Sequence, residues 1–223
     1  MQIECVKGGF WEIIQKRTIN KLFCDYNGIC TIYFYDKSPK ELNVGCSVYN
    51  SQYGLQISED ERNLFVGSWE KGLRAYDIES GSLLWKSSDR KIRHIFVYTT
   101  YLIALKAYGA VFKYDINNGT KIGEIKSGSI GRMYDLGFPY VYVDAVKGKQ
   151  SIIDVEKMLV VKKYSEKIVN PFNYLSVSIK DIVLRDNVLT ISGTEEYPNK
   201  DYSKSGGIAF SRVIDSDFGA IEF

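Results

Sequence analysis

The fold is decided by the stretch Gly72-Leu73-Arg74-Ala75-Tyr76-Asp77-Ile78-Glu79-Ser80-Gly81-Ser82-Leu83-Leu84-Trp85-Lys86. Similar stretches run over 109–122 and, less closely, over 148–160, with an earlier copy at 28–36 and a later one at 207–215. The aspartates at positions 36, 77, 115 and 154 follow one another in steps of 41, 38 and 39 residues. A period of this length indicates a repeat protein built from one supersecondary unit.

Each copy has the turn chemistry of linked hairpins. Glycine opens a strand after a tight turn, because it adopts positive φ without steric cost. Aspartate ends that strand, and Glu-Ser-Gly or Asn-Asn-Gly forms the next turn. Upstream strands such as 55–57 and 63–67 bring the expected number to four short strands per repeat. The 17 Tyr and 11 Phe against only 4 Pro favour strands as well.

The string Tyr-Asp-Ile-x-x-Gly-x-x-x-Trp-Lys resembles the outer-strand signature of propeller repeats in the quinoprotein-like (PQQ-like) and WD40-like families. The resemblance is good around Tyr76 and Tyr114 and fainter in the first and last fifths of the chain. It implies an all-β fold, a β-propeller of about five four-stranded blades. The chain lacks the Trp-Asp and Gly-His pairs of typical WD40 repeats and the cofactor ligands of quinoproteins, so the resemblance implies architecture and not activity.

We expect one propeller domain over 1–223, with blades near 7–48, 52–89, 92–128, 130–166 and 172–215. In the fifth blade, a long polar loop over 194–206 follows the strand 188–192 and delays the aspartate at 215. That blade lacks an outer strand, which either 218–223 or 2–6 would supply. An open β-solenoid or sandwich is the alternative, and closure is favoured because open ends leave strand edges unpaired.

Composition narrows the class of protein. No apolar run approaches the roughly 18 residues that cross a bilayer, and the first residues do not form a signal peptide, so we expect a cytoplasmic protein that does not bind membranes. A net charge of +2 argues against a nucleic-acid partner, because such binders are commonly strongly basic. The cysteines at 5, 24, 30 and 46 form no CxxC pair, which predicts reduced thiols in a β core and no metal site.

No catalytic constellation is visible in the sequence. The single histidine, His94, enters a strand and is expected to pack there. The glycine-rich stretches 128–131 and 205–207 lack the Lys-Ser/Thr of a phosphate loop and are interpreted as turns. Six carboxylates lack metal-ligand spacing: Asp89, Asp135, Asp144, Asp181, Asp186 and Glu70. The chain is therefore expected to be non-enzymatic and to bind no cofactor, although two carboxylates meeting in a central channel would support a hydrolase.

A partner-binding face is predicted where the turns between second and third strands meet the connections between blades. Trp, Tyr and Arg dominate binding energy at protein interfaces, and these residue types recur there. Trp69 and Tyr108 hold the same place in adjacent blades and are the best candidates for an exposed aromatic pair, unless their rings pack between blades. The predicted partner-binding residues are Trp69, Glu70, Lys71, Tyr108, Arg90, Arg93, Arg132, Tyr134, Glu195, Glu196, Tyr197 and Tyr202.

These features favour a propeller that binds one protein partner. The size of the chain and its lack of recognisable chemistry suit a dedicated inhibitor, such as an immunity protein that neutralises a bacterial toxin. The alternative is a small-ligand binder or hydrolase with its site in the central channel. A nucleic-acid-binding propeller would require Arg90, Lys91, Arg93 and Arg132 to form one patch, with binding lost steeply as salt rises.

Overall fold

The computed structural model describes residues 2–6, 9–13, 16–25, 27–46, 54–107, 109–126, 131–145, 150–164, 176–196, 207–216 and 218. The strands form five antiparallel sheets, each a succession of hairpins in chain order. No helix among these residues is long and apolar enough to span a membrane. The chain divides into two compact units, Met1–Lys126 and Ser127–Phe223.

The first sheet contains one strand more than the sequence predicts. Its strands are β1 (Gln2–Val6), β2 (Gly9–Ile13), β3 (Ile19–Asp25), β4 (Ile29–Phe34) and β5 (Lys40–Asn43). The segment 2–6 was one of two candidates for the missing strand of the last blade, but it pairs with β2. Only two residues separate β1 from β2 in the chain, so this pairing needs the smallest loop to close.

The other two sheets of the first unit have four strands each. The second sheet contains β6 (Leu55–Ile57), β7 (Asn63–Ser68), β8 (Gly72–Asp77) and β9 (Leu83–Lys86). The third sheet contains β10 (Ile92–Val97), β11 (Tyr101–Lys106), β12 (Ala110–Asp115) and β13 (Lys121–Lys126). The repeated aspartates end β8 and β12, as predicted. Asp115 then accepts hydrogen bonds from the amides of Asn117 and Asn118, which fixes the turn.

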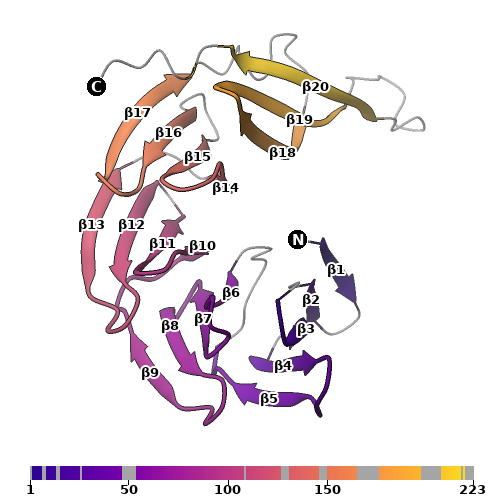
Figure 1. Cartoon of the computed structure of the whole chain (residues 1–223), viewed down its shortest axis with the longest axis vertical. Coiled ribbons are helices and arrows are strands. Elements are labelled where there is room, and N and C mark those ends of the chain that lie inside the picture. Colours follow the sequence, from indigo (N-terminus) through magenta and orange to yellow (C-terminus); the bar gives the residue numbers. More distant parts are fainter. Residues whose placement is uncertain are drawn as a thin grey trace. The chain divides into compact units, whose positions relative to one another are not determined.

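The second sheet lies between the first and third sheets of its unit and is buried on both faces (Figure 1). Along β7, Leu64 and Val66 join the core shared with the first sheet, whereas Phe65 joins the core shared with the third. This alternation follows from the two-residue period of a strand, and it explains why β7 is apolar at successive positions. A Cβ added to Gly67 would lie 2.8 Å from Ile92, so the sheets pack very closely there.

The tyrosine of the repeat ties the second and third sheets to the connections that precede them. The Tyr76 hydroxyl donates to the carbonyl of Val44, just after β5, at 2.7 Å. The Tyr114 hydroxyl donates to the Asp89 carboxylate, in the connection after β9, at 2.8 Å. Burial raises the pKa of both phenols, so they stay protonated donors. In these two sheets, the tyrosine of the Tyr-Asp-Ile string therefore donates a hydrogen bond to the preceding connection.

The second unit contains the fourth and fifth sheets. The fourth comprises β14 (Gly131–Asp135), β15 (Tyr140–Ala145), β16 (Gln150–Asp154) and β17 (Leu159–Tyr164), and the fifth comprises β18 (Ser176–Arg185), β19 (Val188–Glu196) and β20 (Gly207–Asp215). Tyr164 donates to the Asp215 carboxylate at 2.6 Å, and Lys162 pairs with the same carboxylate. These contacts tie β20 to β17 within the second unit.

The cysteines described by the structure confirm the prediction of thiols in a β core. Cys24, Cys30 and Cys46 are free and buried in the core between the first two sheets. Cys24 lies opposite Cys30 on β3 and β4, and the contact between the two thiols, together with burial, raises the pKa of Cys30. The neutral thiol is therefore the favoured form, which suits a packing role.

Candidate functional site

The two ends of the second sheet carry different turns. The turns from β6 to β7 and from β8 to β9 lie at one end of the strands, and the turn from β7 to β8 lies at the other. This follows from antiparallel pairing, because each strand reverses the direction of the last. Three of the residues predicted to bind a partner, Trp69, Glu70 and Lys71, form the β7–β8 turn.

We name the exposed group at this end the Trp69 surface. It comes from the β7–β8 turn and from the connection leading into β10, all within the first unit. The Trp69 surface comprises Trp69, Glu70, Lys71, Arg90, Lys91 and Arg93. Five of these six residues belong to the predicted partner-binding set, and Lys91 belongs only to the basic patch that a nucleic acid would require.

Backbone hydrogen bonds hold the two segments of the Trp69 surface together. The amide of Lys91 donates to the carbonyl of Trp69 at 2.8 Å, and the amide of Ala107 donates to the carbonyl of Lys91 at 2.8 Å. Gly72 approaches the same connection so closely that an added Cβ would lie 2.5 Å from the Asp89 carbonyl oxygen. The connection is therefore fixed between two turns.

Lys91 has a backbone conformation that is unusual for its residue type. Its φ is +64°, in the left-handed region that side chains with a Cβ rarely adopt. The hydrogen bonds on both sides of the residue maintain this conformation. Strained residues of this kind persist where the surroundings determine them, and they concentrate at functional sites.

The side chains of the Trp69 surface face solvent to a large extent. Trp69 is 39% exposed, and the Lys91 ammonium lies 5.9 Å from the centroid of its ring. Lys71 and Arg90 are exposed, and Arg93 is half-buried. An indole beside several cations provides both a contact surface and charge.

The acidic residue next to these cations is turned inward. Besides the Tyr114 bond, the Asp89 carboxylate lies 3.6 Å from the Lys121 ammonium. Its charge is thus balanced within the fold and does not offset Arg90 or Lys91. Glu70 is then the one carboxylate on the Trp69 surface, against four cations.

Three predicted binding residues, Tyr108, Tyr197 and Tyr202, lie outside the described residues. The proposed pairing of Trp69 with Tyr108 therefore stays a prediction. Arg132 is exposed on β14 and belongs to the second unit.

The structure corrects the prediction that Tyr134 is a surface residue. Tyr134 is 8% exposed and packs edge-on against Tyr142 with ring centroids 6.1 Å apart. The two residues lie opposite each other on β14 and β15, so the ring is part of the core of the second unit. A tyrosine within a strand does not by its residue type indicate which face of the sheet it occupies.

The long loop of the fifth blade also begins later than predicted. The strand β19 continues to Glu196, so Thr194, Glu195 and Glu196 are strand residues and not loop residues. Glu195 pairs with Val177 on one side and with Ile208 on the other. The polar character of this segment suggested a loop, but pairing with two neighbouring strands extends the sheet through it.

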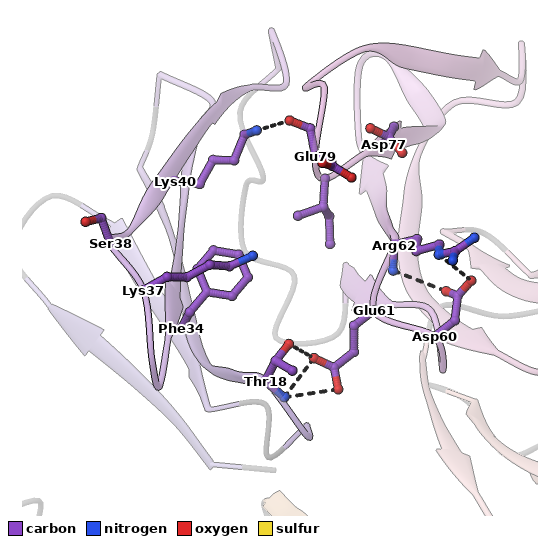
Figure 2. Close-up of a pocket in the computed structure, with 11 residues that line it drawn as sticks. Thr18, Phe34, Lys37, Ser38, Lys40, Asp60, Glu61, Arg62, Asp77 and Glu79 are labelled. Carbon is purple, nitrogen blue, oxygen red and sulfur yellow. Dashed lines mark hydrogen bonds and ion pairs between the residues drawn. The ribbon is translucent and has the colours of Figure 1, made fainter.

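At the opposite end of the second sheet is a pocket that the sequence did not reveal (Figure 2). It has a volume of about 670 Å³ and lies between the first and second sheets. Figure 2 shows Lys37 and Lys40 on one side and Glu61, Arg62 and Asp77 on the other. The lining residues are Thr18, Phe34, Lys37, Ser38, Lys40, Asp60, Glu61, Arg62, Asp77, Ile78 and Glu79.

Glu61 is the central bonding residue of this pocket. Its carboxylate accepts hydrogen bonds from the amide of Arg17 at 2.6 Å, from the amide of Thr18 at 2.9 Å and from the Thr18 hydroxyl. Burial would raise the pKa of Glu61, but these hydrogen bonds outweigh it and lower the pKa below its ordinary value. The carboxylate thus joins the β6–β7 turn to the segment before β3.

The other charged groups of the pocket also have partners inside the first unit. The Lys40 ammonium donates to the Glu79 carbonyl, and the Lys37 ammonium lies 4.1 Å from the centroid of the Phe34 ring. Arg62 and Asp60 form an ion pair at 4.0 Å. The pocket lies at the seam between two sheets, and two of its charged groups, Glu61 and Lys40, join the sheets. The charged run 59–62 indicates a turn, but no pattern in the sequence indicates its partner 43 or 44 residues away.

Of the residues that the sequence analysis weighed for catalysis, His94 and Asp135 have local structural roles. His94 is 4% exposed within β10. Asp135 accepts a hydrogen bond from the amide of Gly137 at 2.9 Å. Within the described ranges, no three His, Cys, Asp or Glu residues gather as metal ligands would.

Comparison with known proteins supports the fold. No protein-family model matches the chain, and no curated protein matches it. Among solved structures, the β-propeller domain of Cps50 (Swd1) from Myceliophteria thermophila is similar, with a TM-score of 0.61 and 11% sequence identity. The match covers 94% of this chain and 73% of that one. The chain therefore has an all-β fold of the β-propeller type, which confirms the expectation from the repeat.

Proposed function

We propose that this chain is a non-enzymatic propeller that binds one protein partner through the Trp69 surface. The observation that carries the proposal is an exposed indole with the Lys91 ammonium 5.9 Å from its ring centroid, on a turn whose backbone is hydrogen-bonded to the connection that carries Lys91. Trp and Arg are the residues most enriched where interface binding energy concentrates. A surface fixed before binding loses little conformational entropy when the partner docks.

Affinity capture from lysate of the source tests the proposal, with Trp69→Ala compared against wild type. The matched control is Tyr35→Ala, because Tyr35 is another exposed aromatic of the first unit, 59% exposed and just after β4. We expect wild type and Tyr35→Ala to capture the same stoichiometric protein, and Trp69→Ala to lose it. Equal capture by Trp69→Ala and wild type would place the binding surface elsewhere.

A finer form of the proposal makes the partner a toxin and the chain its immunity protein. It is supported by the local structural roles of the described His94 and Asp135. The test is the activity of the captured partner. Stoichiometric inhibition by wild type and not by Trp69→Ala is expected, and a partner whose activity is unchanged in the complex would contradict this form.

A further inference from the structure

The local charge of the Trp69 surface differs from that of the whole chain. The chain carries a net charge of +2, whereas this surface alone has four cations and one carboxylate. Across the described part of the chain, Lys71, Arg90 and Arg93 form no ion pair, in contrast to Arg62 and Lys121 elsewhere in the same unit. Lys71, Arg90 and Arg93 therefore carry charge that no ion pair among the described residues balances.

The position of Asp89 strengthens this asymmetry. It is adjacent to Arg90 in the chain and would be the natural counter-charge for the surface. The fold instead directs its carboxylate to Tyr114 and Lys121. An attractive field from the remaining cations then extends into solvent over about 8 to 10 Å at physiological salt.

We propose that the Trp69 surface binds an extended acidic segment of the partner protein, an inference that rests on the proposed function. Carboxylates of that segment lie against Lys71, Arg90, Lys91 and Arg93, and an apolar side chain packs on Trp69. Charge complementarity of this kind sets specificity and association rate, and the indole contributes contact area. The Lys91 ammonium already lies 5.9 Å from the ring centroid in the free chain.

An acidic protein segment fits this surface better than a nucleic acid. Proteins that bind nucleic acids commonly neutralise about 6 to 10 phosphates along a continuous basic groove. Here four cations come from two short segments, and one of these segments also carries the carboxylate of Glu70. Such a small, mixed surface suits a short peptide with few carboxylates and one apolar anchor.

Fluorescence anisotropy of a labelled probe peptide tests the inference with the full-length chain. The probe has Asp and Glu on both sides of a central Leu, and the reference peptide replaces them by Asn and Gln. We expect the acidic peptide to bind at least about tenfold more tightly than the reference peptide, which corresponds to roughly 1.4 kcal/mol. Binding should weaken as salt is added.

Two charge-reversal variants provide the matched comparison. Lys71→Glu/Arg90→Glu alters exposed cations of the Trp69 surface, and Lys37→Glu/Arg62→Glu makes the same change in net charge at the pocket. We expect the first variant to bind the acidic probe at least about tenfold more weakly, and the second to stay within about twofold of wild type. Equal losses in both variants would overturn the inference, because the effect would then follow the net charge of the chain.

The remaining outcomes separate this inference from the proposed function. If a single-stranded RNA binds more tightly than the acidic peptide and Lys71→Glu/Arg90→Glu abolishes that binding, the acidic-protein assignment is wrong. If capture of the partner requires Trp69 but survives Lys71→Glu/Arg90→Glu, the proposed function stands and this inference fails. If capture survives Trp69→Ala, the proposed function fails on its own test.

Discussion

The two ends of the second sheet use charge in opposite ways. At the pocket end, Glu61 and Lys40 each bond to backbone groups of the neighbouring sheet. Their charges therefore stabilise the packing of the first sheet against the second. At the Trp69 end, Lys71 and Arg90 extend into solvent while the nearby carboxylate of Asp89 is bonded inward. The same six-residue strands β7 and β8 connect the two ends. The difference teaches that charged side chains in the turns of one sheet can either join neighbouring sheets or remain exposed to solvent.

The largest expected effect comes from the glycines at the two ends. Gly72 and Gly81 have φ values of +76° and +75°, but a Cβ on Gly72 meets the Asp89 carbonyl at 2.5 Å, whereas one on Gly81 meets a Leu42 methyl group at 3.2 Å. We expect Gly72→Ala to destabilise by about 3 kcal/mol and Gly81→Ala by about 1 to 2 kcal/mol, because a methyl group moves aside more readily than backbone.

Urea unfolding followed by tryptophan fluorescence measures this difference. Trp11, Trp69 and Trp85 all lie in the first unit, so the signal reports on the unit that contains both glycines. Equal losses of stability for the two variants would mean that the connection at the Trp69 end is less rigid than its contacts indicate.

A smaller effect is expected from the glutamates at the two ends. Glu61→Ala removes the acceptor for two backbone amides and a hydroxyl, and we expect a loss of about 1 to 2 kcal/mol, limited by solvent exposure. Glu70→Ala removes the same charge from an exposed position and should stay within about 0.5 kcal/mol of wild type. The same unfolding measurement applies, and a large loss for Glu70→Ala would contradict the assigned difference between the ends.

The dependence of stability on pH tests the bonding of Glu61 more selectively. Its pKa is lower in the folded chain than the ordinary value of 4.5, so its contribution is fully present above that value and is lost as pH falls through the lowered folded-state pKa. The stability difference between wild type and Glu61→Gln should therefore shrink between about pH 6 and about pH 3. A difference that is constant over this range would show that ionisation of Glu61 does not contribute to the seam.

The smallest expected effect is a gain of stability at the Trp69 end. Glycine adopts the left-handed conformation of Lys91 without steric cost, so Lys91→Gly should stabilise the first unit by about 0.5 to 1 kcal/mol. The same change removes one cation of the Trp69 surface and should weaken capture of the partner. Lys71→Gly is the control, since Lys71 is not among the residues with positive φ and should be slightly destabilised by glycine. If Lys91→Gly lowers stability, the left-handed conformation is not a source of strain.

The repeat and its strands could be predicted because their signals are local. The turn after Asp115 is encoded by residues within four positions, and the period places the sheets in order. The pocket could not be predicted, because Glu61 bonds to Arg17 and Thr18 across two sheets. The burial of Tyr134 was missed for a related reason, since the face of a strand that is buried depends on the neighbouring sheet. Exposure of Trp69 followed from its place in a turn.

The tyrosine bonds between sheets have a consequence for how the first unit assembles. They span 32 residues for Tyr76 and 25 residues for Tyr114, so both partners of each bond are present once the chain has been synthesised through the strand that carries the tyrosine. Contacts between residues that are close in sequence favour rapid folding. Because each repeat contacts its neighbours, a folded sheet stabilises the next sheet along the chain. The first unit is thereby suited to fold vectorially, in the direction in which the ribosome releases it.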